Sequence, residues 1–403
     1  MSGASTSEQR WLSRFLRDET VGGGLMICAA VLAIIFANSP AADFYNRTAM
    51  RTLSIPQVHL SMTVAQWAAD FLLAFFFLIA GAELKHELVL GSLSSRKRAL
   101  APLSGAVGGM VMSALVFLAT TSLMGGDHLD RHGWAIPTST DIAFALAILA
   151  IIGRGTAPAI RVLLLSVAVI NDLGSILIIG ALFASDFRVL ALAAALVFIA
   201  LWWVMQQLGV RSLLAYAPVF LLAWYFMHAS GVHATVAGMA LGLATKATRV
   251  ERNPRSGVEL LEHWLRPVVA AVAVPLFAFF AAGIDVRGTD TVSHLGSPLA
   301  IAIICGLVIG QPSGVFLGTW LAVKARFGEI HESLRWVDVA VASSLAAMGF
   351  TVALLVTSIA YPWSESRVAD SKMGIVVAVI CATGLSVLVT RYARGTSERE
   401  SLT

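Results

Sequence analysis

The sequence predicts an all-α polytopic membrane protein, and three observations support this: the hydrophobic composition, the number of long apolar segments and the distribution of basic residues. Of the 403 residues, 58% are hydrophobic and 13% are charged, and the mean hydropathy is +0.81. A soluble domain carries about 25% charged residues. This chain therefore has too little polar surface to cover a water-soluble globule, and lipid is the solvent that fits it.

The apolar segments are long enough to cross a bilayer, which takes roughly 20 residues in a helix. About twelve candidate spans lie at residues 21–38, 62–84, 99–124, 134–152, 157–184, 188–208, 212–229, 232–247, 264–284, 297–321, 336–360 and 372–391. We expect one transmembrane domain over residues 21–394, a cytoplasmic segment at 1–20 and a cytoplasmic tail at 395–403. No small-residue cleavage site interrupts the first span, so we expect it to be a retained anchor.

The basic residues set the expected orientation. If the N-terminus is cytoplasmic and the spans alternate, most loop Lys and Arg residues face the cytoplasm, including the run Arg96, Lys97 and Arg98. This satisfies the positive-inside rule. We therefore expect a bacterial inner (plasma) membrane protein with both termini in the cytoplasm. The net charge of +4 belongs to this topology, and we expect no nucleic-acid partner.

Ionisable side chains at membrane depth cost about 2.5–3.5 kcal/mol on insertion scales, so they are functional candidates. Asp172 lies about 22 Å along a helix that enters from the cytoplasm near Ala157. A carboxyl group in a low dielectric favours its protonated form and can exchange a proton for a cation near neutral pH. We predict that Asp172, with Asp141, Thr140 and backbone carbonyls, binds either H⁺ or Na⁺, which is sufficient for antiport. A purely structural hydrogen bond is the alternative role of Asp172.

Two spans contain helix-breaking sequences. Residues 137–140 read Pro-Thr-Ser-Thr before Asp141, and residues 348–351 read Met-Gly-Phe-Thr, ending at Thr351. Proline removes a backbone donor, and Ser or Thr can satisfy the groups that it frees. Interrupted spans in opposite orientations predict an inverted repeat with two crossed discontinuous helices. Asp141 is placed to neutralise the positive helix N-termini; a simple kink with a buried Asp is the alternative.

Three further features support this transporter hypothesis without defining it. Asp70 lies about 12 Å from the outer end of its span, where it either lines an outer funnel or has a structural role. Gln311 reaches a depth similar to that of Asn171. The outer residues 51–61 alternate polar and apolar side chains around Pro56, which fits a small hairpin or an irregular loop equally well.

Several collinear motifs resemble the NhaA sodium/proton antiporter family. They are Gly-Trp-Ala-Ile-Pro at 133–137, Thr-Asp-Ile-Ala-Phe-Ala-Leu at 140–146, Asn-Asp-Leu-Gly at 171–174, Ser-Gly-Val-His-Ala-Thr at 230–235, Pro-Leu-Phe-Ala-Phe at 275–279 and Gly-Phe-Thr at 349–351. The resemblance implies an aspartate-based Na⁺ or Li⁺ site at two crossed broken helices. It also implies a homodimer held partly by the outer hairpin, with no cofactor beyond the transported ions.

The resemblance assigns roles residue by residue. Asp141 and Thr140 match the broken-helix positions, and Asp172 matches the principal ion-binding aspartate. Candidate pH-response positions are matched by Glu83, Lys85, Glu87, Glu262 and His263 at the cytoplasmic mouth and by His233 near the outer end of its helix. An ordinary solvated helix end remains the alternative for residues 83–87, and a buried structural imidazole for either histidine. His86 and Arg266 differ from the family pattern, which leaves the pH response open.

The chain also departs from the family at the ion site itself. The usual pair of aspartates is Asn171-Asp172 here, and the usual lysine opposite is Gln311. A buried charge that loses its partner is strongly destabilising, so the paired loss is physically coherent. We expect fewer protons per sodium, with one giving electroneutral exchange. Stoichiometry, cation preference and the dimer interface stay open.

Other function classes fit less well. Sodium-coupled uptake of an organic solute needs a polar substrate cavity, and the spans hold few polar residues for one. An intramembrane aspartyl protease needs a second aspartate in a Gly-x-Gly-Asp context, which residues 170–173 do not provide, so we do not expect an enzyme. A channel would not need a broken helix, and no ring of charges is evident.

Overall fold

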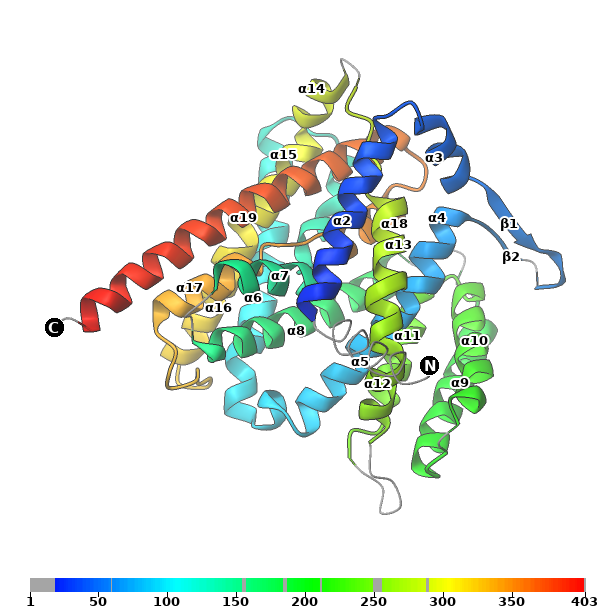
Figure 1. The fold of residues 1–403 in the computed structure, drawn as a ribbon, viewed down its shortest axis with the longest axis horizontal. Helices are drawn as coiled ribbons and strands as arrows, with labels where there is room; N and C mark the ends of the chain where they lie inside the picture. The colour runs from blue at the N-terminus through cyan, green and yellow to red at the C-terminus, as the bar shows by residue number, and fades with distance from the viewer. Residues whose placement is uncertain are drawn as a thin grey trace, which may run out of the picture. The chain divides into compact units, whose positions relative to one another are not determined.

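The computed structural model describes residues 19–58, 60–153, 157–183, 187–210, 212–248, 256–287 and 290–401. Within these residues the protein is almost entirely helical (Figure 1). The expected N-terminal segment at 1–20 lies almost wholly outside the described residues, as do the last two residues of the expected tail. The helices have these bounds: α2 (Glu19–Ala37), α3 (Ala42–Ala49), α4 (Val64–Trp67), α5 (Leu73–Val89), α6 (Arg96–Leu123), α7 (Ile142–Ile152), α8 (Pro158–Leu182), α9 (Val189–Gln207), α10 (Leu213–Ala229), α11 (Thr235–Ala244), α12 (Gly257–Val268), α13 (Val274–Ala281), α14 (Asp290–Leu295), α15 (Pro298–Cys305), α16 (Gln311–Lys324), α17 (Trp336–Leu345), α18 (Thr351–Ala360) and α19 (Glu365–Ser401).

Short irregular turns link several of these helices. π-helical turns join α4 to α5 (η2, Ala68–Leu72), α12 to α13 (η5, Val269–Ala273) and α15 to α16 (η6, Gly306–Gly310). A 3₁₀ segment, η4 (Asp130–Thr138), precedes α7; shorter ones lie at η1 (Pro56–Val58) and η3 (Ser92–Ser94). Each π turn continues one helical path, so the paired helices act as single long rods.

The predicted membrane class is confirmed. Seven helical rods among the described residues are long and apolar enough to cross a membrane, or up to nine if each of two bent helix pairs is one span. Shorter apolar helices lie at 214–229, 235–244, 336–345 and 351–360. Every one of the twelve predicted segments contains a helix or two consecutive helices, while the count of twelve spans stays a prediction.

Both predicted helix breaks are present. The first lies between η4, which ends at Thr138, and α7, which begins at Ile142, and the two axes bend by 52°. The second separates α17, which ends at Leu345, from α18, which begins at Thr351. Pro137 and the Ser and Thr residues around it explain the first break, because the side chains can replace lost backbone partners.

Residues 51–61, which fitted a hairpin and an irregular loop equally well, form a hairpin. Strands β1 (Thr52–Ile55) and β2 (Leu60–Thr63) pair antiparallel, with Thr52 opposite Thr63. Ser54 Oγ and Ser61 Oγ lie 3.0 Å apart across the pair. The residues of β1 are all exposed, whereas Leu60 and Met62 of β2 are buried in an apolar cluster with residues of α5 and α10, so β1 is the exposed edge of the hairpin.

The chain forms two compact units. The first comprises residues 1–91 and 176–283, and the second comprises residues 92–175 and 284–403. In the first unit α5 and α11 pack backbone to backbone: a Cβ on Gly238 would lie 2.1 Å from the carbonyl oxygen of Ala74. Beside them, stacked aromatic rings of Phe75 and Phe220, 4.4 Å apart at their centroids, fill the space against α10.

In the second unit α6 and α16 make the corresponding close contact. A Cβ on Gly314 would lie 2.2 Å from the carbonyl oxygen of Gly108, and a Cβ on Gly318 would lie 2.1 Å from that of Ser104. Helices in lipid associate through such small residues because a hydrophobic driving force between them is absent. This packing fixes the first turn of α16, which begins with Gln311.

Candidate ion-binding site

Thr140 is the centre of a buried polar network in the second unit. It lies in the extended residues 139–141 between η4 and α7, and its side chain is 0% exposed. Its hydroxyl donates to the carbonyl oxygen of Ala346 over 2.7 Å. Ala346 follows the last residue of α17, so this bond ties the two helix breaks together.

Two buried amides converge on the same hydroxyl oxygen. Asn171 Nδ2 lies 3.0 Å and Gln311 Nε2 lies 3.2 Å from Thr140 Oγ1. A hydroxyl has one proton, and Thr140 gives it to Ala346, so it can only accept from the amides. This fixes the orientation of both amides with their NH₂ groups toward Thr140 and their oxygens elsewhere.

The two amide oxygens are therefore the notable acceptors of the network. Asn171 Oδ1 and Gln311 Oε1 are buried and have no hydrogen-bond partner in the part of the chain that the structure describes. Both residues are 0% exposed. A buried acceptor without a partner costs about 1–3 kcal/mol, so two of them together mark a place that favours a positive ligand.

Asp141 connects the N-termini of two half-helices. One carboxylate oxygen accepts from the backbone N–H of Phe144 at 3.0 Å and so caps α7. The other accepts from the backbone N–H of Thr351, the first residue of α18, at 3.1 Å. The backbone N–H of Asp141 donates to Met348 over 2.6 Å. This geometry matches the expected compensation of two positive dipole ends by one carboxylate.

Asp172 is a buried carboxylate on α8. It follows Asn171 in the chain and is 1% exposed. The buried residues at the two helix breaks and on this stretch of α8 offer carboxylate, amide and hydroxyl oxygens, which are the ligands that hard cations take. Among the described residues, no three His, Cys, Asp or Glu side chains cluster to hold a metal ion. The arrangement suits an alkali cation better than a transition metal.

The comparison with known proteins fits this chemistry. The family described as Na+/H+ antiporter 1 matches residues 13–390. This chain belongs to that family. It is 44% identical to Na(+)/H(+) antiporter NhaA 2 of Mycolicibacterium gilvum, covering 97% of this chain and 90% of the relative. It is 41% identical to NhaA 1 of Saccharopolyspora erythraea, covering 95% and 92%, and 40% identical to NhaA 3 of Streptomyces coelicolor, covering 96% and 81%. The resemblance seen in the sequence motifs is thereby confirmed.

A cavity of about 380 Å³ lies between the first turns of α6 and the first turns of α8. Its polar lining includes Arg98, Glu329 and His331, and Ser166 reaches it from α8. Ser166 precedes Asn171 by five residues, about 8 Å along the helix. The lining of the cavity therefore ends about one and a half turns of α8 from Asn171.

The first unit brings together two other predicted residues, Asp70 and His233. Asp70, in the π turn η2, has one oxygen 3.0 Å from His233 Nε2 and the other 3.4 Å from His228 Nδ1. Its backbone carbonyl accepts from Trp224 Nε1 at 3.0 Å. Sequence reasoning missed His228 because it sits on the last turn of α10, where a solvated histidine is ordinary.

The candidate pH-response residues gather only in part. Arg266 on α12 bonds to Glu83 on α5 and lies 3.7 Å from Glu262. Arg266 therefore pairs with two of the predicted positions. The remaining candidates are Lys85 and Glu87, on the last turns of α5, and His263, which stands edge-on to Trp264 at 5.6 Å.

Proposed function

We propose that this chain exports Na⁺ or Li⁺ in exchange for H⁺ by alternating access, and that Asp172 carries both ions in turn. Family membership supports the exchange activity, and the buried position of Asp172 supports its role. The observation that carries this proposal is the setting of Asp172. Asn171, which precedes it on α8, is neutral, as are Thr140 and Gln311, which share the hydrogen bonds of the Asn171 amide, and both oxygens of Asp141 are engaged at helix N-termini.

We assign the cation ligands to oxygens of this network. Asp172 supplies the negative charge, and Asn171 Oδ1 and Gln311 Oε1 supply neutral acceptors. The hydroxyl oxygen of Thr140 already accepts hydrogen bonds from two amides, so it can coordinate the cation only when one of these amides turns away. In this view Gln311 does more than replace a lysine, because it removes a positive charge and adds an oxygen ligand.

The charge balance of such a site favours one proton per sodium. With a proton bound, Asp172 is a neutral carboxylic acid; with Na⁺ bound, the carboxylate and the cation again sum to zero. Since Asn171 and Gln311 do not titrate, both loaded states carry the same net charge across the membrane. The membrane potential then does no work on the exchange, and transport is electroneutral.

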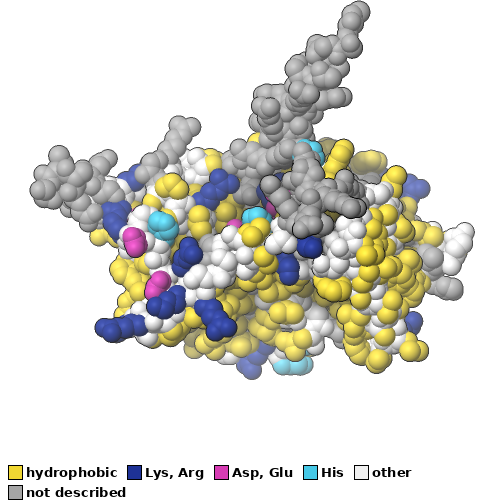
Figure 2. Space-filling view, turned by 90° about the horizontal axis from the view of Figure 1, so that it is seen from below, with side chains coloured by type: hydrophobic (Ala, Val, Ile, Leu, Met, Phe, Trp, Pro, Cys, Tyr) yellow, Lys and Arg dark blue, Asp and Glu magenta, His cyan; other side chains and the backbone are white. Residues whose placement is uncertain are grey.

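The wider architecture of the proposal follows the same reasoning. The twelve spans over residues 21–394 would form an inverted repeat, with the breaks near Asp141 and Thr351 crossing at the ion site. Lys and Arg side chains gather on the face seen in Figure 2, where few Asp or Glu side chains appear. This supports cytoplasmic termini in a bacterial inner membrane. The exposed hairpin of β1 and β2 offers an edge for a homodimer.

Two peripheral groups have proposed roles in access and regulation. Asp70 with His233 would line the outer funnel, and Glu83, Glu262 and Arg266 would make the cytoplasmic mouth sensitive to pH together with Lys85, Glu87 and His263. No observation favours sodium-coupled solute symport, and the relatives described above are named as Na⁺/H⁺ antiporters.

The test uses purified protein in proteoliposomes with a pH-sensitive dye inside. Na⁺ or Li⁺ is added with the membrane potential clamped at zero or at either sign. We expect proton movement that does not depend on the potential and that is lost in Asp172→Asn. Movement that follows the potential would keep antiport and reject the one-to-one ratio. No movement in the unmodified protein would reject the proposed function.

A further inference from the structure

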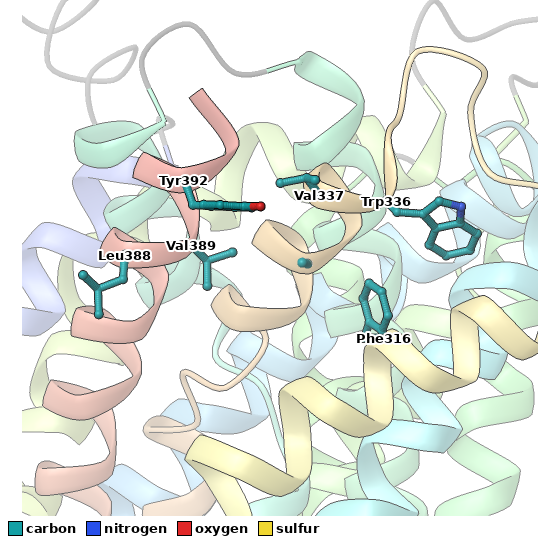
Figure 3. Close-up of a pocket in the computed structure, with 7 residues that line it drawn as sticks. Phe316, Trp336, Val337, Leu388, Val389 and Tyr392 are labelled. Carbon is teal, nitrogen blue, oxygen red and sulfur yellow. The ribbon is translucent and has the colours of Figure 1, made fainter. Parts of the chain in front are cut away.

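A second feature of the second unit lies apart from the polar network: an apolar groove of about 500 Å³ between α16, α17 and α19 (Figure 3). Only apolar and aromatic side chains line it. Phe316 of α16 and Trp336 of α17 meet edge to face with ring centroids 5.9 Å apart. From α19, Leu388 and Tyr392 are 66% and 69% exposed, and the ring of Tyr392 extends toward α17.

Basic residues lie at the end of α16, at the start of α17 and in the last third of α19. Lys324 is the last residue of α16 and places its ammonium 4.3 Å from the centre of the Trp320 ring. Trp320 itself lies one turn beyond Phe316, on the same face of α16. Arg391 is exposed and directly precedes Tyr392 on α19. Arg335 precedes Trp336 at the start of α17.

Two of the three acidic groups near the ends of α16 and α17 are already paired. Asp338 is buried and pairs with Arg335 at 3.2 Å. Glu329, in the loop between α16 and α17, pairs with Lys97 of α6 at 3.2 Å. Glu332 is exposed in the same loop, opposite in charge to the exposed Arg326 there. Lys324 and Arg391 remain as positive side chains on two of the helices that line the groove, and we place the mouth of the groove beside them.

We propose that this groove holds one acyl chain of an anionic phospholipid whose headgroup lies against Lys324 and Arg391. The groove alone does not select a lipid, because lipid tails are as apolar as its lining. Selection comes from the charged mouth, since basic pockets between spans on the cytoplasmic side attract anionic headgroups. Trp336 and Tyr392 are the side chains expected at headgroup level, because the apolar ring of such a residue contacts lipid while its polar N–H or O–H group contacts water.

Occupancy of the groove bears on the ion site through α17. The residues that follow this helix, Ala346 and Met348, accept hydrogen bonds from Thr140 and Asp141. A lipid chain held between Trp336 and Tyr392 thus stabilises one position of the half-helix that joins the polar network. This consequence rests on the proposed exchange function, whereas the binding site itself does not.

The test is native mass spectrometry of the purified full-length protein, with phosphatidylglycerol and phosphatidylcholine as probes. We expect one tightly retained phosphatidylglycerol per protomer and weak phosphatidylcholine binding. The double variant Lys324→Gln/Arg391→Gln should weaken phosphatidylglycerol binding by roughly fivefold for each cation removed. Ala340→Phe, which fills the groove with both cations intact, should abolish retention. Arg96→Gln, an exposed cation at the start of α6, is the matched control and should bind as the unmodified protein does.

Lipid selectivity and the effect of the groove variants are two independent readouts. The melting temperature of each variant is measured as well, to establish that it folds. Equal affinity for the two lipids, or full retention in either groove variant, overturns the proposal. Loss of a dimer in Ala340→Phe with unchanged lipid retention also overturns it, because the groove would then hold a second copy of the chain. Exchange of Na⁺ for H⁺ in the same samples is measured separately, so an inactive protein that still binds phosphatidylglycerol rejects only the proposed function.

Discussion

Asn171 and Gln311, the neutral pair at the candidate ion site, allow a double-mutant cycle, which is the sharpest test of the structure. The changes are Asn171→Asp, Gln311→Lys and the two combined. Both side chains are 0% exposed, and both amide nitrogens bond to Thr140 Oγ1, at 3.0 and 3.2 Å. A carboxylate and an ammonium placed there would come within ion-pairing distance of each other.

The expected magnitudes follow from this burial. A single buried charge without its partner costs about 3–5 kcal/mol. An ion pair near 4 Å regains about 4 kcal/mol at an effective dielectric constant of 20. The double variant should therefore be much more stable than the sum of the single variants, with a coupling free energy of about 3 kcal/mol. Asn171→Asp should be milder at pH 5 than at pH 8, because the introduced carboxyl can stay protonated at low pH.

Two assays report the outcome. Fluorescence-detected thermal unfolding should show a fall in melting temperature of about 6–20 °C for Gln311→Lys, from 3–5 kcal/mol at 2–4 °C per kcal/mol, and recovery in the double variant. Proteoliposome transport should become sensitive to membrane potential in the double variant, since a second titrating acid now takes part. A coupling free energy below about 1 kcal/mol would refute the inferred proximity of these side chains. Potential-dependent transport by the unmodified protein would refute the electroneutral site.

Three further predictions test other parts of the structure. Gly314→Ala, whose Cβ would overlap the backbone of α6, should destabilise by about 1–3 kcal/mol, whereas Gly384→Ala, with nothing within 4 Å, should be neutral in the same unfolding assay. Asp141→Asn removes the charge at two helix N-termini and should cost about 1–2 kcal/mol in that assay, together with loss of exchange in proteoliposomes. A backbone hydrogen bond to the carboxylate, together with Arg367, lowers the pKa of exposed Asp127. The small stabilising effect of this carboxylate is therefore present near neutral pH and is lost as pH falls below about 4. Limited proteolysis of the loop that holds Asp127 should show this acid dependence in the unmodified protein and not in Asp127→Asn.

The helix breaks were predictable because their cause is local. Pro137 lacks a backbone donor, and hydroxyl side chains follow it at once, within a segment otherwise apolar enough to span. Asp141 was predictable for the same reason, since an acid beside a break has two helix N-termini to neutralise. The hairpin at 51–61 was only half predicted, because alternation over so few residues does not distinguish strands from a loop.

Tertiary convergence was not predictable from the residues alone. Depth along a span suggested that Asn171 and Gln311 lie at the same level, yet their shared contact with Thr140 depends on how α8 and α16 pack. The contact of His228 with Asp70 depends in the same way on the packing of α10. The π turns were also missed, because an apolar helical sequence reads alike whether its carbonyls bond four or five residues ahead.

Thr140 shows why such a site needs its unusual residue types. Its hydroxyl has one proton and two acceptor positions, and all three are used, by Ala346, Asn171 and Gln311. The amide oxygens face away from Thr140 and can meet a cation directly, whereas a cation reaches the hydroxyl oxygen itself only when one amide turns away. The same hydroxyl holds the end of α17 through Ala346. In the proposed function, ion binding and the position of the half-helix are therefore linked through one oxygen atom. Thr140→Val keeps the shape, removes that oxygen and leaves its three buried partners unsatisfied, so it should destabilise the protein by about 1–3 kcal/mol for each of them. In the folded variant, ion binding and transport should separate: Na⁺ binding should persist at reduced affinity and exchange should stop. Retained exchange in Thr140→Val would show that the linkage runs elsewhere.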